Sequence, residues 1–485
     1  MRALSKTSLL KREWLLVFAD ARARGESADR YSAKHFLTQA PIMSIMPDTS
    51  EMQIATTLRQ AIPNLDPTRS LQISELERFY EDRVEVTELL KRMEVELQVQ
   101  NNCKFLLTGH RGAGKSSALT KLEQMLEIGN GLWVVPISIL DKLNLSDVDS
   151  KDIIFLMALE ILEQCKKHNL KLSKAVQLRL ETWSNEIEIV KTIGESAQMS
   201  AETKAEISTP SLGWLTLPVK ALLSVGGRVG KETETREAIR KTIKPAFSEL
   251  LAIIDDLQQE IFRLTQKQVV CLVDGTDKTT IEIAETLFYK NGADLSAPQV
   301  SVVYTFPVAL QSSQEFNQIT AYFNDTFVLP NFKIQAQQHQ STQAEKDAEL
   351  EHCKHGIEGL QHIITRRVQA NLFNPVALKD ICQASGGIPR IALQLAKAAC
   401  VNAVVRQDTQ VNTDDVARAI TRERQAFQKM LTYAQLELLQ DVRTKKTIDT
   451  DPEKGYLQLL HNLSVIEYVN GKVWYDVHPI VHDLL

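Results

Sequence analysis

Eight consecutive residues have the types and order needed to hold a phosphate group. They match the pattern G-x-x-x-x-G-K-S and are Gly109, His110, Arg111, Gly112, Ala113, Gly114, Lys115 and Ser116. Glycines let the backbone turn its N–H groups toward a phosphate, at the positive end of the helix that follows. In such a loop Lys115 neutralises the β- and γ-phosphates and the Ser116 hydroxyl binds Mg²⁺. These residues predict a site for ATP with Mg²⁺.

The residues on both sides of this loop fit the same interpretation. An apolar run at 105–108 predicts a short buried strand, and residues 117–122 continue as a helix that starts with Ser117. We therefore include Ser117 with the eight loop residues in the expected nucleotide site. The alternative is a glycine-rich strand-to-helix turn that carries Lys-Ser by coincidence.

Two acidic residues downstream are candidates for the metal and for the attacking water. Asp274 follows the apolar run 269–273, and a buried parallel strand delivers such a carboxylate to the sheet edge where ligands bind, so Asp274 is the expected second Mg²⁺ group. Many ring-forming ATPases have a glutamate directly after this aspartate, but here Gly275 follows. Asp277 is therefore the candidate for orienting water, and a helix-capping or ion-pairing role is the alternative.

Two further polar residues could meet the terminal phosphate. Thr305 follows the apolar run 300–304, at what we expect to be the end of a strand, although a polar residue is also ordinary there. Arg390 stands just inside a helix that opens with Ser385-Gly386-Gly387-Ile388-Pro389. Proline suits a first helical turn, and an arginine there can donate two hydrogen bonds to a phosphate.

The elements that must position these residues alternate along the chain. Strands are expected at 132–139, 269–273, 300–304 and 326–329 in addition to 105–108, and long amphipathic helices at 73–98 and 235–264. Strands that alternate with helices predict an α/β fold, a parallel sheet covered on both faces. We expect four parts: an N-terminal helical extension (1–72), the α/β domain (73–335) with an insertion at about 180–235, a helical domain (336–427) and a compact C-terminal unit (428–485).

Composition limits the classes of protein that fit. The net charge of −5 and pI near 6.1 argue against a broadly basic nucleic-acid binder. Six cysteines without C-x-x-C spacing indicate a reducing compartment, with neither a disulfide framework nor a zinc site. No apolar run is long enough to span a bilayer. We expect a cytoplasmic protein.

The loop at 109–116, Asp274, the Thr305 strand and the Gly386-Gly387-Ile388-Pro389-Arg390 helix, in this order, resemble an AAA+-related P-loop ATPase. The similarity is greatest to origin-recognition-like initiators and to STAND-type (KAP-like) signalling ATPases, and it covers about 73–485. It implies a three-layer αβα domain, a helical lid that carries Arg390 as a phosphate sensor, and a winged helix. It also suggests a role in bacterial antiviral defence or signalling.

The C-terminal unit fits a winged helix, because helical patterns at 434–442 and 453–463 precede two β-rich runs joined by Asn470-Gly471. Its presumed recognition helix offers Lys454 and His461 but also Glu453, and the unit carries more acid than base. Since DNA affinity comes mainly from neutralising phosphates, packing or protein contact fits better than DNA binding.

Our leading hypothesis is a slowly hydrolysing ATP-dependent switch that controls homo-oligomerisation or a partner protein. In it Lys115, Ser116 and Asp274 hold Mg·ATP, Asp277 orients water and Arg390 senses the γ-phosphate. One alternative is a DNA-loading ATPase of initiator or transposition-regulator type. Another is a scaffold that binds ATP without turning it over, which Gly275 would permit.

Overall fold

The computed structural model describes residues 52–128, 131–186, 215–216, 219–220, 222–223, 233–336, 343–470 and 472–485. The chain divides into two compact units, 1–51, which lies outside the described residues, and 52–485. Most of the predicted insertion at 180–235 also lies outside them. Within the described ranges, no helix has the length and apolar character needed to cross a membrane.

The centre of the α/β domain is a five-stranded sheet in the order β2-β3-β4-β1-β5. Every neighbouring pair in it is parallel. The strands are β1 (Lys104–Gly109), β2 (Leu132–Ser138), β3 (Gln268–Asp274), β4 (Ser301–Pro307) and β5 (Asp325–Val328). The predicted parallel α/β sheet is confirmed. Because β4 lies between β1 and β3, the ends of these three strands meet at one edge of the sheet.

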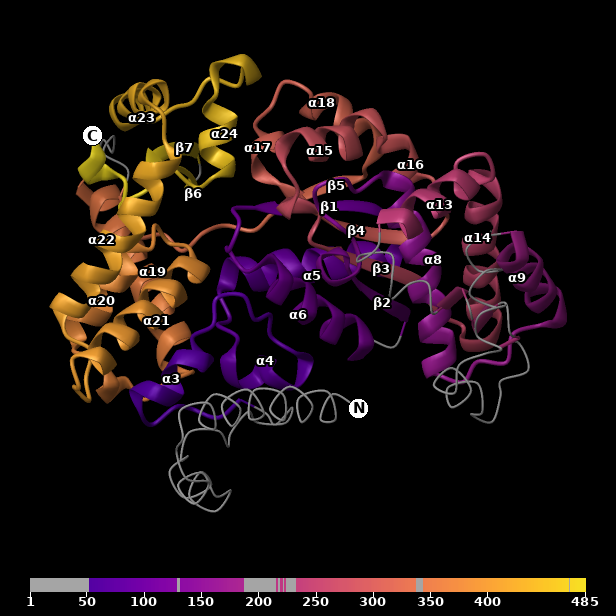
Figure 1. The fold of residues 1–485 in the computed structure, drawn as a ribbon, viewed down its shortest axis with the longest axis horizontal. Coiled ribbons are helices and arrows are strands. Elements are labelled where there is room, and N and C mark those ends of the chain that lie inside the picture. Colours follow the sequence, from indigo (N-terminus) through magenta and orange to yellow (C-terminus); the bar gives the residue numbers. More distant parts are fainter. Residues whose placement is uncertain are drawn as a thin grey trace, which may run out of the picture. The chain divides into compact units, whose positions relative to one another are not determined.

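Helices cover both faces of this sheet (Figure 1). Successive strand residues point to opposite faces: Phe105 and Leu107 of β1 pack with α5 (Val84–Val99) and α6 (Lys115–Ile128). Leu106 belongs to the core formed with α8 (Ser150–Lys167) and α14 (Phe247–Thr265). The remaining helices of this part are α3 (Leu58–Asn64), α4 (Ile73–Phe79), α7 (Ile139–Lys142), α9 (Lys174–Glu186), α13 (Thr233–Ile243), α15 (Ile281–Glu285), α16 (Gly292–Ser296), α17 (Val308–Gln311) and α18 (Phe316–Ile319). The result is a three-layer αβα domain.

Two helices expected to be continuous are broken, so those predictions are wrong. The helix expected at 235–264 is split into α13 and α14, because Pro245 disfavours helical geometry in the residue before it. The helix expected at 73–98 is split into α4 and α5. At that break the Arg83 guanidinium donates to the Pro330 carbonyl (2.6 Å) and lies over the Phe332 ring. A distant contact therefore overrides the local apolar pattern.

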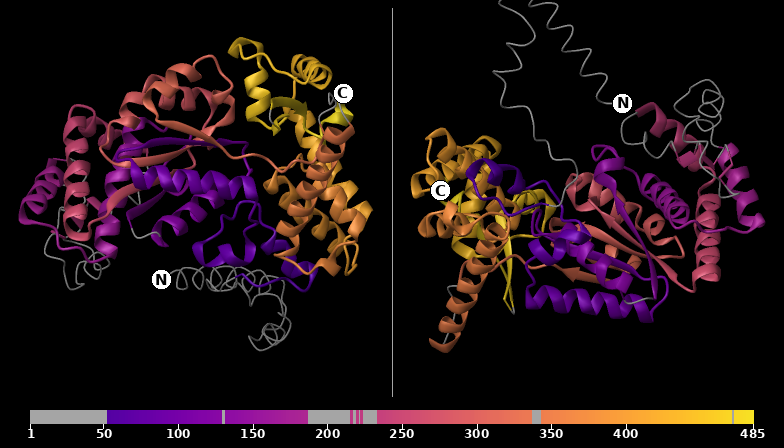
Figure 2. Two further views of the ribbon diagram at one scale, coloured as in Figure 1. Left: turned by 180° about the vertical axis from the view of Figure 1, so that it is seen from behind. Right: turned by 90° about the horizontal axis from the view of Figure 1, so that it is seen from below.

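The rest of the chain forms a second hydrophobic core. The lid (343–430) consists of α19 (Gln343–Thr365), α20 (Pro375–Ala384), α21 (Pro389–Val405) and α22 (Thr413–Met430). The C-terminal module (433–485) consists of α23 (Tyr433–Lys445), α24 (Tyr456–His461) and the antiparallel strands β6 (Val465–Asn470) and β7 (Lys472–Val477). Both views in Figure 2 place the module beside the lid helices. The second predicted C-terminal helix is shorter than expected, and α3 packs against α21.

The segment 330–334 links the sheet to the lid and is enclosed by close backbone contacts. The Phe332 N–H donates to the Gly387 carbonyl (3.0 Å). A β-carbon added at Gly387, whose φ is +82°, would lie 2.0 Å from the Phe332 oxygen. A β-carbon added at Gly356 of α19 would lie 1.9 Å from the Lys333 oxygen. The two glycines therefore let the lid approach this segment.

We expect Gly356→Ala to destabilise the protein, although alanine normally stabilises a helix relative to glycine by about 1 kcal/mol. The added methyl group must displace the Lys333 backbone, and overpacking of this kind costs about 1–3 kcal/mol. Urea unfolding followed by circular dichroism measures the change. Glu358→Ala, at an exposed position on the same helix, is the control and should leave the midpoint within error. A higher midpoint for Gly356→Ala would contradict the packing argument.

Candidate nucleotide-binding site

The predicted phosphate-binding loop joins β1 to α6. β1 ends at Gly109 and α6 begins at Lys115. Gly109, Gly112 and Gly114 have φ angles of +139°, +85° and +107°, which strain any residue with a side chain. Because α6 begins at Lys115, the N–H groups of its first turn have no acceptor within the helix. The loop therefore has the backbone geometry of an anion cradle.

The Lys115 side chain is held inside this loop. Its ammonium group donates to the carbonyl oxygens of Gly109 (2.6 Å) and His110 (2.9 Å). It also lies 2.9 Å from Oδ2 of Asp277, and the two side chains are only 4% and 2% exposed. The lysine at the start of α6 and the aspartate that follows β3 therefore form a buried ion pair.

The electrostatics of Asp277 follow from this pair. Burial works against its charge, but the Lys115 ammonium outweighs burial, with smaller contributions from Lys278 and Thr305, and lowers the pKa of Asp277. Its other oxygen, Oδ1, is buried without a hydrogen-bond partner among the described residues. The residue predicted to orient water is thus the counter-ion of the loop lysine, and its role toward water stays a prediction.

Asp274 and Ser116, the two expected Mg²⁺ groups, lie next to each other. Burial raises the pKa of Asp274 and outweighs the opposite effects of the nearby Lys278, Ser116 and Lys115 side chains. Oδ1 of Asp274 has no partner among the described residues. No cluster of three or more metal-ligating side chains occurs in the described ranges. One carboxylate and one hydroxyl still fit Mg²⁺, which keeps several waters and binds phosphate oxygens.

Position 275 has no room for the glutamate that ring-forming ATPases carry. Gly275 has a φ of +101°, and a β-carbon there would lie 2.9 Å from Cγ of Leu140 and 3.0 Å from Cγ1 of Ile139. Its N–H donates to the Thr305 hydroxyl (2.9 Å), which also lies 3.1 Å from the Thr276 hydroxyl. Thr305 is two residues inside β4 rather than at its end, so it fixes the turn after β3, and a phosphate contact stays a prediction.

Three other predicted loop positions contact the surrounding protein. Nε2 of His110 accepts a hydrogen bond from the Glu467 N–H in β6 (2.7 Å), and burial lowers the pKa of His110 to about 3. The Arg111 guanidinium donates to the carbonyls of Asp277 (3.3 Å) and Thr279 (2.7 Å). The Ala113 N–H donates to the His110 carbonyl (3.1 Å). Both side chains of the His-Arg pair are therefore directed at protein groups.

Arg390 is placed at the loop by the lid. α21 begins at Pro389, and the Arg390 N–H donates to the Gly112 carbonyl (3.2 Å). A β-carbon at Gly112 would lie 2.6 Å from Cβ of Arg390, so only glycine permits this approach. The side chain lines the same pocket as Lys115 and Ser116. The structure thus brings a residue from far along the sequence to the predicted site.

The pocket at the loop has a volume of about 120 Å³, smaller than the roughly 300–1,000 Å³ of most ligand sites. Besides Arg367, its walls include residues that the sequence did not indicate, namely Pro67, Thr68, Arg69, Ser70, Leu71, Phe79, Tyr80, Glu81 and Arg83. Burial raises the pKa of Tyr80 to about 12, so its hydroxyl stays protonated. These residues follow no motif and lie far from the loop in sequence. Only the path of the chain brings them there.

Comparison with known proteins gives weak similarities. No family model matches the sequence, and no curated protein matches it. The Cdc6 protein of Pyrobaculum aerophilum is 11% identical over 86% of this chain and 94% of its own, with a TM-score of 0.38. Drosophila ORC bound to DNA is 13% identical over 93% and 99%, with a TM-score of 0.35. The Thermotoga maritima RuvB Holliday-junction motor is 13% identical over 70% and 66%, with a TM-score of 0.29. Values this low do not bear on activity or partners.

We expect Lys115→Met to cost about 3–5 kcal/mol of stability, because it leaves the buried Asp277 carboxylate unpaired. Lowering the pH should reduce this loss. In the wild type the pKa of Asp277 lies below the unfolded-state value of about 3.9. The ionised carboxylate therefore stabilises the fold at pH values above about 3.9. In the variant the Lys115 contribution is gone, and burial outweighs the smaller contributions of Lys278 and Thr305 and raises that pKa. The penalty is therefore present at neutral pH and disappears as the carboxylate is protonated. Urea midpoints at pH 7.5 and pH 5 test this.

Lys115→Met/Asp277→Asn is the companion variant, since a neutral amide removes the unpaired charge. It should recover most of the stability and lose the pH dependence. A Lys115→Met loss that is the same at both pH values, or that the second substitution leaves unchanged, would contradict the ion-pair account.

Proposed function

We propose that this chain is an ATP-binding, slowly hydrolysing molecular switch of AAA+-related type. In this proposal the nucleotide site controls the position of the C-terminal module and, through it, self-association or a partner protein. The observation that carries the proposal is that loop residues which should surround a phosphate also bond to the module and to the lid.

Each part of the site has a role in this proposal. Lys115 and the N–H groups at the start of α6 hold the phosphates, Ser116 and Asp274 hold the metal, and Arg390 contacts the terminal phosphate. When bound, Mg·ATP would supply the γ-phosphorus that water attacks and the phosphoanhydride bond that breaks as ADP leaves, and the metal would neutralise charge on the phosphates. Asp277 orients that water once Lys115 has turned to the phosphates. Slow turnover is supported by Gly275, which offers no carboxylate, and by the engagement of Asp277 with Lys115.

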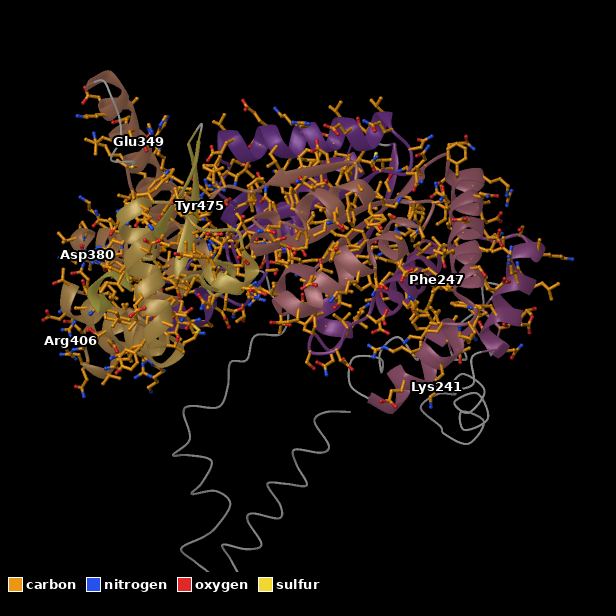
Figure 3. All side chains as sticks on the ribbon, turned by 90° about the horizontal axis from the view of Figure 1, so that it is seen from above. Lys241, Phe247, Glu349, Asp380, Arg406 and Tyr475 are labelled. Carbon is orange, nitrogen blue, oxygen red and sulfur yellow. The ribbon has the colours of Figure 1, made fainter. Side chains whose placement is uncertain are left out.

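A chain of contacts leads from the lysine to the C-terminal module. Lys115 donates to the His110 carbonyl, and the His110 ring accepts from the Glu467 N–H. The Glu467 carbonyl accepts from Asn331 (3.4 Å), and its carboxylate accepts from Ser312 (3.5 Å) and from Tyr475 (3.0 Å), which Figure 3 labels. A lysine that moves to a phosphate releases the His110 carbonyl, so the nucleotide site and the module are mechanically connected.

The contact between the module and the loop leaves two buried polar atoms without hydrogen-bond partners among the described residues. His110 uses Nε2 for Glu467, while its Nδ1 is buried without a partner among the described residues. The Asn331 amide nitrogen donates to the Glu467 carbonyl, and Oδ1 of Asn331 is also buried without a partner among the described residues. Each unsatisfied buried polar atom costs about 1–3 kcal/mol, and exposure to water removes that cost. The interface is therefore suited to opening.

The alternative as a DNA-loading ATPase finds less support in the module. The helix expected to meet DNA, 453–463, is represented by α24, and of its six residues only Gln458 is exposed. Lys454, which precedes α24, is exposed but pairs with Asp449. α24 packs on α17, and His461 is buried and hydrogen-bonded to the Thr279 backbone. A packing role fits these contacts. The resemblance to STAND-type ATPases, a role in antiviral defence or signalling, homo-oligomerisation, a cytoplasmic location and the alternative as a scaffold without turnover all stay predictions.

We expect Asp277→Asn to lower the rate of ATP hydrolysis by about 10²–10⁴-fold, the usual contribution of a positioned acid or base. The affinity of the variant for ATP should not fall, because the Asp277 carboxylate no longer competes with the phosphates for the Lys115 ammonium. The test is to measure phosphate release and the Kd of a fluorescent ATP analogue for the same protein samples. Both measurements are made with and without DNA.

Asp256→Asn is the matched control, since Asp256 pairs with Arg179 at 2.8 Å on the far helix α14 and should leave both values unchanged. A wild-type rate for Asp277→Asn would show that Asp277 has no part in hydrolysis. A loss of affinity as large as that of Lys115→Ala would show that Asp277 only holds the lysine.

We expect a non-hydrolysable ATP analogue with Mg²⁺ to speed hydrogen exchange of the Glu467 amide, because it draws Lys115 away from His110. His110→Ala should exchange fast with or without the analogue, whereas His110→Gln keeps an acceptor and should resemble the wild type. Exchange of the peptide 465–469, followed by mass spectrometry, measures this. Tyr475→Phe alters a partner of the Glu467 carboxylate but not of its amide, and is the control. An analogue that binds without changing exchange at 465–469 would contradict the proposed coupling.

A further inference from the structure

The pocket at the phosphate-binding loop is lined by six side-chain cations, and four of them have close partners. Lys115 pairs with Asp277, and Arg69 pairs with Glu75. The other two donate to backbone carbonyls: Arg83 to Pro330, and Arg367 to Phe79 (3.3 Å) and Ile363 (2.7 Å). These four charges are engaged by the protein itself.

The other two, Arg390 and Lys278, have no such partner among the described residues. The lid delivers Arg390, as described above. The nearest acidic atom to the Lys278 ammonium is Oδ2 of Asp274 at 4.0 Å, against 2.9 Å for Lys115 and Asp277. The Lys278 side chain is only 18% exposed, so its contact with water is limited. Among the described residues, the Lys278 ammonium therefore has no anionic group at hydrogen-bonding distance.

Lys278 stands on a short and well-fixed turn. It is the last residue of the 3-10 turn Thr276–Lys278, and its N–H donates to the Gly275 carbonyl (3.0 Å). Thr305 holds the start of this turn through the Gly275 N–H. The charges that Lys278 faces are Lys115, Asp274 and Asp277. These are the residues to which the proposed function assigns phosphate, metal and water.

We propose that Lys278 is a phosphate-binding residue that contacts the terminal phosphate of ATP together with Arg390. This inference rests on the proposed function, because it assumes the phosphates lie in the loop. It is favoured over a purely structural pairing with Asp274 for two reasons. The 4.0 Å separation is at the limit of an ion pair. A divalent metal at Asp274 would also repel the ammonium toward the phosphate oxygens, which accept charge-assisted hydrogen bonds.

Lys278→Gln tests the proposal by comparing di- and triphosphate affinities. With Mg²⁺ present, we expect the Kd of a fluorescent non-hydrolysable ATP analogue to rise at least about tenfold, or 1.4 kcal/mol. The Kd of the matching ADP derivative should change less than about twofold. Lys278→Arg keeps the charge and should restore most of the affinity for the triphosphate. Lys290→Gln, whose parent lysine pairs with Glu285 at 3.1 Å on the surface, is the control and should bind both nucleotides as the wild type does.

The possible outcomes distinguish the role of Lys278 from the proposed function on which it rests. A wild-type protein that binds neither nucleotide would overturn the proposed function, and the role of Lys278 with it. Wild-type binding of both nucleotides with unchanged triphosphate affinity in Lys278→Gln would overturn the role of Lys278 alone. Equal weakening of di- and triphosphate would do the same, since it excludes a contact specific to the terminal phosphate. Thermal melting of each variant shows that affinities are compared between folded proteins.

Discussion

The buried ion pair between Lys115 and Asp277 is the interaction on which the rest of the site depends. It joins the start of α6, the helix that follows β1, to the turn after β3, and β4 lies between β1 and β3 in the sheet. On one side Lys115 holds two loop carbonyls, and on the other Arg111 holds the backbone of Asp277. A buried pair of this kind adds little net stability because both charges lose their hydration. Its effect is to fix where the lysine lies, and so the shape of the loop.

The local features of the site could be predicted from the sequence because each follows from a short stretch of chain. A strand, a glycine-rich turn and a following helix are indicated within 105–122, although the helix begins at Lys115, two residues before the expected start, and the apolar run before Asp274 indicates a buried strand. Arg390 was predicted from its place in a Gly-Gly-Ile-Pro-Arg helix start. The structure puts its backbone against Gly112, and its predicted contact with a phosphate stays a prediction.

Contacts between distant segments could not be predicted in this way. Nothing around residue 83 indicates that its guanidinium reaches the Pro330 carbonyl, yet this contact accompanies the break between α4 and α5. The same holds for the pocket walls formed by 67–71 and by Arg367. Spacing also could not reveal that Asp277 is paired or that Gly275 packs on Leu140. Each depends on the distance in space between two elements of the fold. The periodicity of apolar residues along the sequence carries no information about that distance.

The hairpin of the C-terminal module has one consequence for assembly. The N–H and the carbonyl of Glu467 both face away from β7, toward His110 and Asn331. These two side chains therefore bond to the edge of β6 that does not pair with β7. If nucleotide moves the module away from the loop, as proposed, Glu467 loses both backbone partners, and an unpaired strand edge is a template for another strand. Opening within one chain would then expose a surface for attachment to another chain in the same step.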